Sequence, residues 1–225
     1  MKIRAFLIIC FTALSVNAQR PQTGTSPTGP LPLDPLTRAE RATAEQIARS
    51  NASVREFLAG DRSRLIYAEF ISVKRNPEVA EPSRRFADVL FYRYKDDSGL
   101  RVLVDLGAGT VADIAPVAGR SVPLASAEVE EAARLALADS DVVRLLGERA
   151  GSFRVATGPA TRAQLTENRI EALRTLGTTP DDPCTRDRCL VLFFRAQNRY
   201  IAMNQVVVDL TAGRVLVNHF GAAAR

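Results

Sequence analysis

Two cysteines near the C-terminus are the residues of this 225-residue chain whose type and spacing most directly suggest chemistry. Cys184 and Cys189 form a C-x4-C pair. A zinc site would need further ligands, but the sequence holds no second close cysteine pair and a single histidine, His219. In a chain that is exported, as the N-terminus indicates below, such a pair is typical of a disulfide. We therefore predict a Cys184–Cys189 disulfide and no metal site.

Two aspartates lie at matching places before glycine turns and could act as a general acid and a general base. Asp105 precedes Gly107 and Gly109, and Asp209 precedes Gly213. Aspartate before a glycine turn commonly accepts hydrogen bonds from the backbone of the bend. The glycines could also suggest phosphate binding, but no helix start follows them to supply free amides. We expect turns at both places and no catalytic pair.

Other candidate groups lack the partners that catalysis requires. Glu128, Glu130 and Glu131 lie near an expected helix start, where the helix dipole favours acidic side chains, and no further metal ligands accompany them. A serine nucleophile would need a base, and the only histidine, His219, lies in an expected terminal strand beside Phe220. The sequence thus predicts no catalytic, cofactor-binding or metal-binding residues.

Five aromatic residues could form a stacking platform for bases or sugars. They are Phe91, Tyr92, Tyr94, Phe193 and Phe194. Because they occupy equivalent positions in two parts of the chain that repeat each other, we expect them to build two hydrophobic cores instead.

The first 18 residues have the three-part layout of a secretory signal peptide. Lys2 and Arg4 precede an apolar run over Ala5–Leu14, and Val16-Asn17-Ala18 offers a small-residue cleavage site. The run is too short for a membrane anchor, because about 20 apolar residues are needed to cross a bilayer. We predict cleavage after this segment, a secreted or periplasmic mature chain without membrane insertion, and a disordered leader over residues 19–32.

The charge of the mature chain is modest. The whole sequence has a formal net charge of +5, and removal of Lys2 and Arg4 lowers it by two, to +3. Acidic residues are interleaved with the basic ones, which is typical of a solvated mixed surface and not of a patch that follows nucleic-acid phosphates. We therefore expect no nucleic-acid partner.

The expected elements repeat along the chain. Leu100–Asp113 is predicted as strand, glycine turn and strand, and Gln205–Val217 repeats this pattern. Asp34-Pro35-Leu36 returns as Val122-Pro123-Leu124, each ahead of a long helix, a polar break and a short helix. Pro116–Pro123, with a glycine, two prolines and no apolar run, is expected to link the two units.

Helix-start, alternation and turn signals give the remaining elements. Thr37 and Glu40 have the spacing of a capping box, which predicts a helix from there to about Arg49. The core face of this helix is expected to hold Leu36, Ala39, Thr43 and Ile47. A second helix is predicted around 54–58, with strands over 65–74, 85–94, 152–157, 169–176, 190–195, 200–210 and 214–220, and loops over 76–83, 95–99 and 158–166.

Helices followed by antiparallel strands, twice over, predict an α+β fold of two tandem units, each a helix packed on an antiparallel sheet. The helix starts at Pro32–Thr37 and Val122–Leu124, together with the hairpin sequence Val-Asp-Leu-Gly-Ala-Gly-Thr-Val at 104–111, resemble the N2 and N3 domains of copper amine oxidases. The resemblance implies two cystatin-like units, an N2-like domain over 33–117 and an N3-like domain over 118–221.

The resemblance does not extend to catalysis. In that family the chemistry requires a tyrosine in an Asn-Tyr-Asp/Glu context, which becomes a quinone, and three histidines that bind copper. Tyr200 has Arg199 before it and Ile201 after it, and one histidine cannot supply three ligands. We therefore expect no enzyme activity and no cofactor.

The sequence favours a non-catalytic, exported binding or interaction protein whose partner is a protein or a peptide. Two alternatives stay open. One is an accessory subunit or regulator of an envelope enzyme, such as a peptidase or an amine oxidase, and the other is an enzyme with an unrecognised site.

Overall fold

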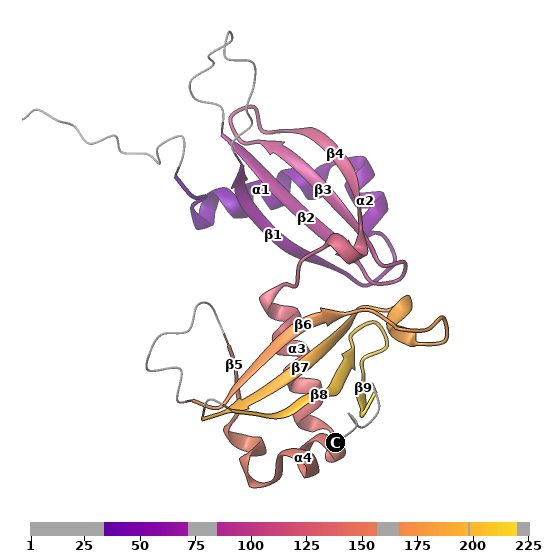
Figure 1. The fold of residues 1–225 in the computed structure, drawn as a ribbon. Coiled ribbons are helices and arrows are strands. Elements are labelled where there is room, and N and C mark those ends of the chain that lie inside the picture. Colours follow the sequence, from indigo (N-terminus) through magenta and orange to yellow (C-terminus); the bar gives the residue numbers. More distant parts are fainter. Residues whose placement is uncertain (1–33, 72–84, 157–166, 198, 220–225) are drawn as a thin grey trace, which may run out of the picture. The chain divides into compact units, whose positions relative to one another are not determined.

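The computed structural model describes residues 34–71, 85–156, 167–197 and 199–219 (Figure 1). The expected signal peptide, the leader and the predicted loops at 76–83 and 158–166 lie outside the described residues. The described chain has an α+β fold with four α-helices and two sheets.

Each sheet follows a pair of helices in the chain. The helices are α1 (Arg38–Ser50), α2 (Ala52–Leu58), α3 (Ser126–Ala138) and α4 (Ser140–Leu146). The strands of the first sheet, in spatial order, are β1 (Ser63–Ile71), β2 (Phe86–Arg93), β3 (Ser98–Asp105) and β4 (Thr110–Ala118). Those of the second are β5 (Arg154–Val155), β6 (Arg169–Thr175), β7 (Cys189–Ala196), β8 (Arg199–Asp209) and β9 (Arg214–Val217).

Neighbouring strands are antiparallel, except that β5 lies parallel to the beginning of β6. The predicted order of helices and strands is confirmed. The strand expected at 152–157 is shorter than predicted, because only Arg154 and Val155 enter the sheet.

The helix starts follow from short-range polar signals. The capping box is confirmed at α1, where the Thr37 hydroxyl oxygen accepts from the Glu40 N–H at 3.1 Å and the Glu40 carboxylate accepts from the Thr37 N–H at 2.8 Å. Asn51 caps α2 by accepting from the Ser53 N–H, and Asp139 caps α4 in the same way. Both helix pairs therefore break at a residue that ends one helix and caps the next.

The buried face of α1 is rotated from the predicted one. Leu36 is buried and Ile47 is half-buried, as expected, but Ala39 and Thr43 are exposed. The helix contacts the sheet instead through Ala44 and Ala48, which are both 0% exposed. Alanines four residues apart lie on one helix face, and their small side chains let the helix backbone approach the strands closely.

Each sheet has one face covered by a long helix (Figure 1). Below α1, the buried core of the first sheet consists mainly of Val89, Phe91, Leu100, Val102 and Val104. Below α3, the core of the second sheet includes Ile170, Leu190, Leu192, Phe194, Ala202, Val206 and Val208. This arrangement follows from the period-two burial of strand residues against the amphipathic stripe of a helix.

Both predicted turn aspartates are confirmed as turn residues. The Asp105 carboxylate accepts from the N–H groups of Gly107 and Ala108, each at 3.0 Å. The Asp209 carboxylate accepts from the Ala212 N–H at 2.9 Å. Gly109 and its counterpart Gly213 have φ angles of +67° and +69°, a conformation that favours glycine.

The aromatic residues build cores, with one exception. Phe91 packs under α1, whereas Tyr92 and Tyr94 belong to the buried cluster that includes α3 and the second sheet. Phe194 belongs to that cluster too, but Phe193 is only half-buried and packs with residues on the other face of the second sheet. β2 is therefore buried on both faces, which explains its nearly continuous run of apolar residues.

The segment expected to link the two units is part of the folded structure. Pro116 to Ala118 belong to β4, and Gly119–Ser121 form a 3-10 turn. Val122 is 2% exposed and joins the cluster that contains Tyr92 and Tyr94. The segment has no apolar run, but it still buries a side chain in the core, because a single valine leaves no periodic signal in the sequence.

Gly119 provides a test of this junction. A Cβ added at Gly119 would collide with the carbonyl oxygen and carboxylate of Asp97, whereas one added at Gly151 meets nothing within 4 Å. We expect Gly119→Ala to lower the free energy of unfolding by about 1–3 kcal/mol through overpacking. Gly151→Ala should change it by less than about 0.5 kcal/mol. Urea unfolding followed by circular dichroism measures both, and equal midpoints would contradict the close packing at Gly119.

Candidate functional site

A carboxylate and a guanidinium that face each other are among the most deeply buried charges of the described chain. Glu128 lies in the first turn of α3 and Arg188 directly precedes β7, and both side chains are 0% exposed. Arg188 Nε donates to Glu128 Oε1 at 2.8 Å, and Nη2 donates to Oε2 at 2.7 Å. The pair thus has the two-point geometry that gives an arginine–carboxylate contact its strength.

The carboxylate has further donors around it. The Ala125 N–H donates to Glu128 Oε2 at 2.9 Å, and the Tyr94 hydroxyl donates to Oε1 at 2.8 Å. Burial alone would raise the pKa of Glu128, but the hydrogen bond and charge of Arg188, helped by these two donors, hold it below its ordinary value of 4.5. Glu128 is therefore ionised and fully engaged, which suits a structural role and not proton transfer.

The guanidinium is equally engaged. Arg188 donates to the carbonyl oxygens of Val122 at 3.2 Å and Pro123 at 2.7 Å. Its planar group also lies 4.3 Å from the ring centroid of Tyr92. These contacts connect the start of α3, the segment before it, β2 and the start of β7.

Glu128 lies in the first turn of α3, as expected, but its position near the helix start does not account for its burial. Its partner Arg188 lies 60 residues away in the sequence, and no spacing pattern predicted the pair. Glu130 is exposed, as a residue favoured by the dipole alone can be. Glu131 accepts from Arg62 and Arg64 at 2.6 Å each, so it too is held by distant arginines.

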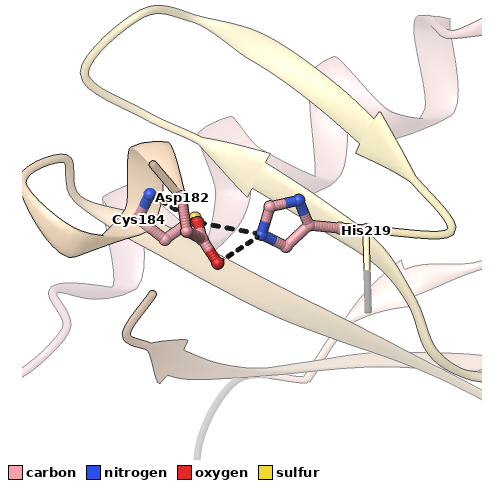
Figure 2. A group of neighbouring side chains, drawn as sticks. All are labelled: Asp182, Cys184 and His219. Carbon is pink, nitrogen blue, oxygen red and sulfur yellow. Dashed lines mark hydrogen bonds and ion pairs between the residues drawn. The ribbon is translucent and has the colours of Figure 1, made fainter. Parts of the chain in front are cut away.

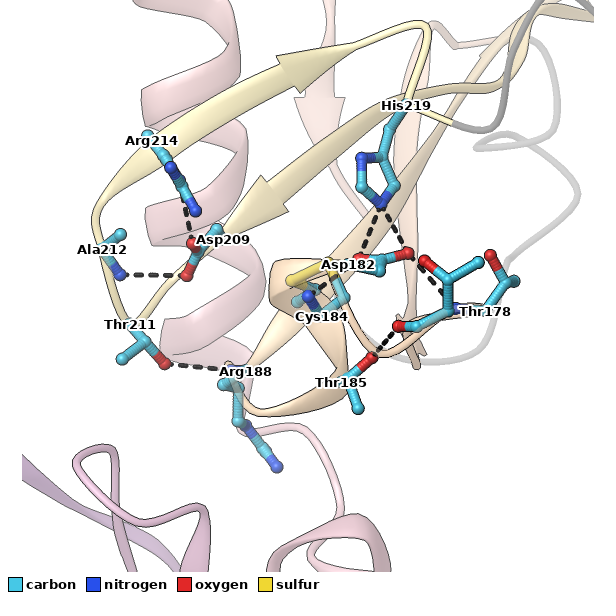
Figure 3. The surroundings of a disulfide bond; sticks show 12 residues. Thr178, Asp182, Cys184, Thr185, Arg188, Asp209, Thr211, Ala212, Arg214 and His219 are labelled. Carbon is cyan, nitrogen blue, oxygen red and sulfur yellow. Dashed lines mark hydrogen bonds and ion pairs between the residues drawn. A yellow bond between two sulfur atoms is a disulfide. The ribbon is translucent and has the colours of Figure 1, made fainter.

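A second cluster surrounds the predicted disulfide, which is confirmed (Figure 3). Cys184 and Cys189 are 1% and 0% exposed, and their Cα atoms lie 5.4 Å apart. We call residues Asp182–Cys189 the disulfide loop. Closing so short a loop stabilises the fold by roughly 2 kcal/mol in the chain-entropy model. Its burial slows its exchange with thiols in solution.

Asp182 and His219 meet beside this disulfide (Figure 2). His219 Nε2 lies 3.0 Å from Asp182 Oδ1 and 3.1 Å from Oδ2. The same carboxylate accepts from the N–H groups of Cys184 at 2.9 Å and Thr178 at 3.2 Å. Burial tends to raise the pKa of Asp182, but these amides and His219 together lower it. His219 follows β9 and does not lie in a strand, because the strand ends at Val217.

An acid, a histidine and a cysteine side by side resemble the parts of a nucleophilic triad. The nucleophile must be a thiolate, however, and Cys184 is bonded to Cys189. In the oxidised chain this cluster therefore performs no thiol chemistry.

The cluster does have the composition of a metal site. One ligand atom from each of Asp182, Cys184 and His219 lies within 4.8 Å of the other two. Asp182 is close to Cys184 in the sequence, and the fold brings His219, 37 residues from Asp182, beside both. A cavity of about 670 Å³ opens next to His219. Its other lining residues are Lys95, Asp181, Pro183, Arg186, Asp187, Arg214 and Leu216.

The second sheet also has an edge that is only partly covered in the described chain. β5 pairs with Arg169 and Ile170 and reaches no further along β6. Beyond that point Leu173 is 62% exposed, and Leu176, just after the strand, is 51% exposed. Large exposed apolar side chains beside an uncovered strand edge are typical of a surface that binds another chain.

Along β6, the backbone N–H and carbonyl groups of successive residues point alternately toward β5 and toward β7. The carbonyl groups of Asn168 and Ile170 accept from the N–H groups of Arg154 and Ala156, each at 3.0 Å, on the β5 side. Alternate residues of a strand bond toward the same side. The N–H and carbonyl groups of Ala172, two residues on, therefore point toward the uncovered edge.

Among the described residues, no helix combines the length and apolar character needed to span a membrane. Comparison of the sequence with models of known protein families and with curated proteins finds no match. The likeness to amine oxidase N2 and N3 domains therefore stays a prediction from the motifs.

The buried pair predicts an acid-sensitive stability. Glu128→Gln keeps the side-chain shape but leaves the Arg188 charge unpaired, so we expect the free energy of unfolding to fall by about 3–5 kcal/mol at neutral pH. Because the pKa of Glu128 is lower in the folded chain than in the unfolded one, its stabilisation is present above the ordinary value of 4.5 and is lost as the pH falls through the folded-state pKa. Urea unfolding at a series of pH values measures both effects.

Glu130→Gln is the matched control, because Glu130 is exposed in the same helical turn. Its free energy of unfolding at neutral pH should stay within about 0.5 kcal/mol of that of the unmodified chain, and its loss of stability in acid should be the same. An acid dependence that is unchanged in Glu128→Gln would contradict the role assigned to the pair.

Proposed function

We propose that the chain is an exported, non-catalytic protein-binding module whose two units correspond to the N2 and N3 domains of copper amine oxidases. The order of two helices followed by antiparallel strands occurs twice and supports this correspondence. The buried disulfide fits the oxidising compartment to which the predicted signal peptide would direct the chain. On this proposal the units span residues 33–117 and 118–221 and are cystatin-like.

The absence of catalysis is proposed because the buried reactive groups are already engaged. Glu128 is neutralised by Arg188, and Asp105 and Asp209 hold turn amides. A general acid or base needs a pKa near the working pH and access to substrate. None of these three carboxylates is accessible, since each is at most 1% exposed.

The edge of β6 beyond Ile170, which no described strand covers, is the observation that carries the binding function. Ala172 directs its backbone groups toward this edge, and Leu173 and Leu176 expose apolar side chains next to it. An extended polypeptide can add there as a further strand, with main-chain hydrogen bonds for affinity and side-chain contacts for selectivity. We therefore propose an extended segment of another protein as the partner.

A peptide library displayed on phage tests this mode of binding. Selected peptides should slow hydrogen exchange at the backbone amides of Ala172 and Arg174 when bound to the full chain. Leu173→Glu should weaken binding by at least about tenfold, since it places a charge in an apolar contact. Leu145→Glu is the control, because Leu145 is 39% exposed on α4 and far from β6 in the sequence. Peptides that bind equally well to both variants would refute the β6 site.

The proposed lack of oxidase activity has its own test. Purified protein incubated with copper and an amine should produce no hydrogen peroxide above a buffer control, because the sequence has no quinone-forming tyrosine motif and a single histidine. Peroxide formation that depends on the protein, on copper and on the amine would overturn this expectation.

A further inference from the structure

We propose that the disulfide loop becomes a zinc site when its disulfide is reduced. The loop would then be held by a covalent bond under oxidising conditions and by a metal ion under reducing ones. The four proposed ligands are Asp182, Cys184, Cys189 and His219.

Three ligand atoms are already placed together. Tetrahedral zinc has ligand distances of about 2.0–2.1 Å to nitrogen and 2.0–2.2 Å to oxygen, so a histidine nitrogen and a carboxylate oxygen on one ion lie about 3.3 Å apart. His219 Nε2 and the Asp182 oxygens are 3.0 and 3.1 Å apart. The sulfur of Cys184 lies within 4.8 Å of both groups. Binding of one ion would require the sulfur to move closer to the other two ligand atoms, to about 3.6 Å from each.

Cys189 supplies the fourth ligand after reduction. Two thiolates on one zinc ion lie about 3.8 Å apart, given a Zn–S distance of about 2.3 Å. The Cα atoms of Cys184 and Cys189 are 5.4 Å apart, which leaves room for both sulfurs to turn toward a common ion. An Asp, a His and two Cys match the nitrogen, oxygen and sulfur ligands that zinc prefers.

The chemistry is a thiol–disulfide exchange followed by metal binding. Two molecules of a small-molecule thiol reduce the Cys184–Cys189 bond, which gives two protein thiols and one small-molecule disulfide. Zinc then binds both sulfurs as thiolates and releases the two thiol protons. The hydrogen that His219 Nε2 donates to Asp182 passes to Nδ1 or to solvent, which leaves Nε2 free to bind the ion. In the reverse direction, one molecule of the small-molecule disulfide oxidises the two thiolates, which restores the Cys184–Cys189 bond, frees the metal ion and, with two protons from solvent, gives two small-molecule thiols.

The carboxylate is oriented by groups that do not compete for the ion. The backbone amides of Cys184 and Thr178 donate to Asp182, and each of its oxygens has a further lone pair for a metal. Such supporting hydrogen bonds fix metal ligands in productive orientations. His219 is reached from the cavity that it lines, so an ion can approach without unfolding of the loop.

The competing explanation is that His219 and Asp182 only tie the end of β9 to the disulfide loop. His219→Gln separates the two explanations, because glutamine keeps a side-chain N–H for Asp182 but replaces the imidazole ligand. Asp181→Asn is the matched control, since Asp181 lines the same cavity but is exposed and is not a proposed ligand.

The test is a Co²⁺ titration of the full chain, followed by competition with Zn²⁺. The oxidised protein should show no thiolate-to-cobalt charge-transfer band. After reduction by a thiol and its removal without air, one equivalent of Co²⁺ should give the band, and Zn²⁺ should abolish it. His219→Gln should weaken Zn²⁺ affinity of the reduced chain by at least about tenfold, and Asp181→Asn should leave it within about twofold.

Reduction could unfold the chain, and circular dichroism would reveal this. A second variant tests the proposal without any reductant. Cys189→Ser leaves Cys184 as a free thiol without any reductant, together with Asp182 and His219. This variant should bind one Co²⁺ with a thiolate band, and adding His219→Gln to it should weaken the binding by at least about tenfold. Equal metal affinity with and without the imidazole, in the reduced chain or in the Cys189→Ser variant, would overturn the proposal, as would equal affinity of oxidised and reduced protein.

Discussion

The burial of Glu128 and Arg188 is the constraint on which much of the described fold depends. Two opposite charges with 0% exposure are tolerated only when every donor and acceptor around them is matched. The groups that match them come from the first turn of α3, the segment before it, β2 and the start of β7. These four parts of the chain must therefore come together correctly before the pair can form.

The disulfide loop is connected to the same constraint. Arg188 belongs to the disulfide loop and directly precedes Cys189, where β7 begins, and its backbone N–H donates to the Thr211 hydroxyl at 2.9 Å (Figure 3). Its side chain holds Glu128 while the next residue, Cys189, holds Cys184. The loop is thus anchored at one end by a buried ion pair and closed by a covalent bond. This explains why the cluster with Asp182 has a defined geometry although it belongs to a loop.

Local signals made the elements predictable, and distance in the sequence made the sites unpredictable. The capping box of Thr37 and the turn role of Asp105 depend on neighbours within three residues, so the sequence alone revealed them. Glu128 meets Arg188 across 60 residues, and Asp182 meets His219 across 37. Nothing in a single sequence marks this arginine and this histidine as buried partners of distant carboxylates. The buried face of α1 was predicted wrongly for a different reason. Alanines are small and only weakly hydrophobic, so buried alanines do not stand out in the hydrophobic pattern of a helix.

Two buried carboxylates, one at Glu128 and one at Asp182, differ in what balances their charge. Both accept hydrogen bonds from backbone amides at the start of a helical turn. The partner of Glu128 is an arginine, which stays protonated under all physiological conditions, so that site has one state. The partner of Asp182 is a histidine, a common metal ligand, and its neighbouring sulfurs exchange a disulfide for thiolates with the redox conditions. Any response of this chain to its surroundings is therefore expected in the disulfide loop, while the buried ion pair keeps the rest of the fold unchanged.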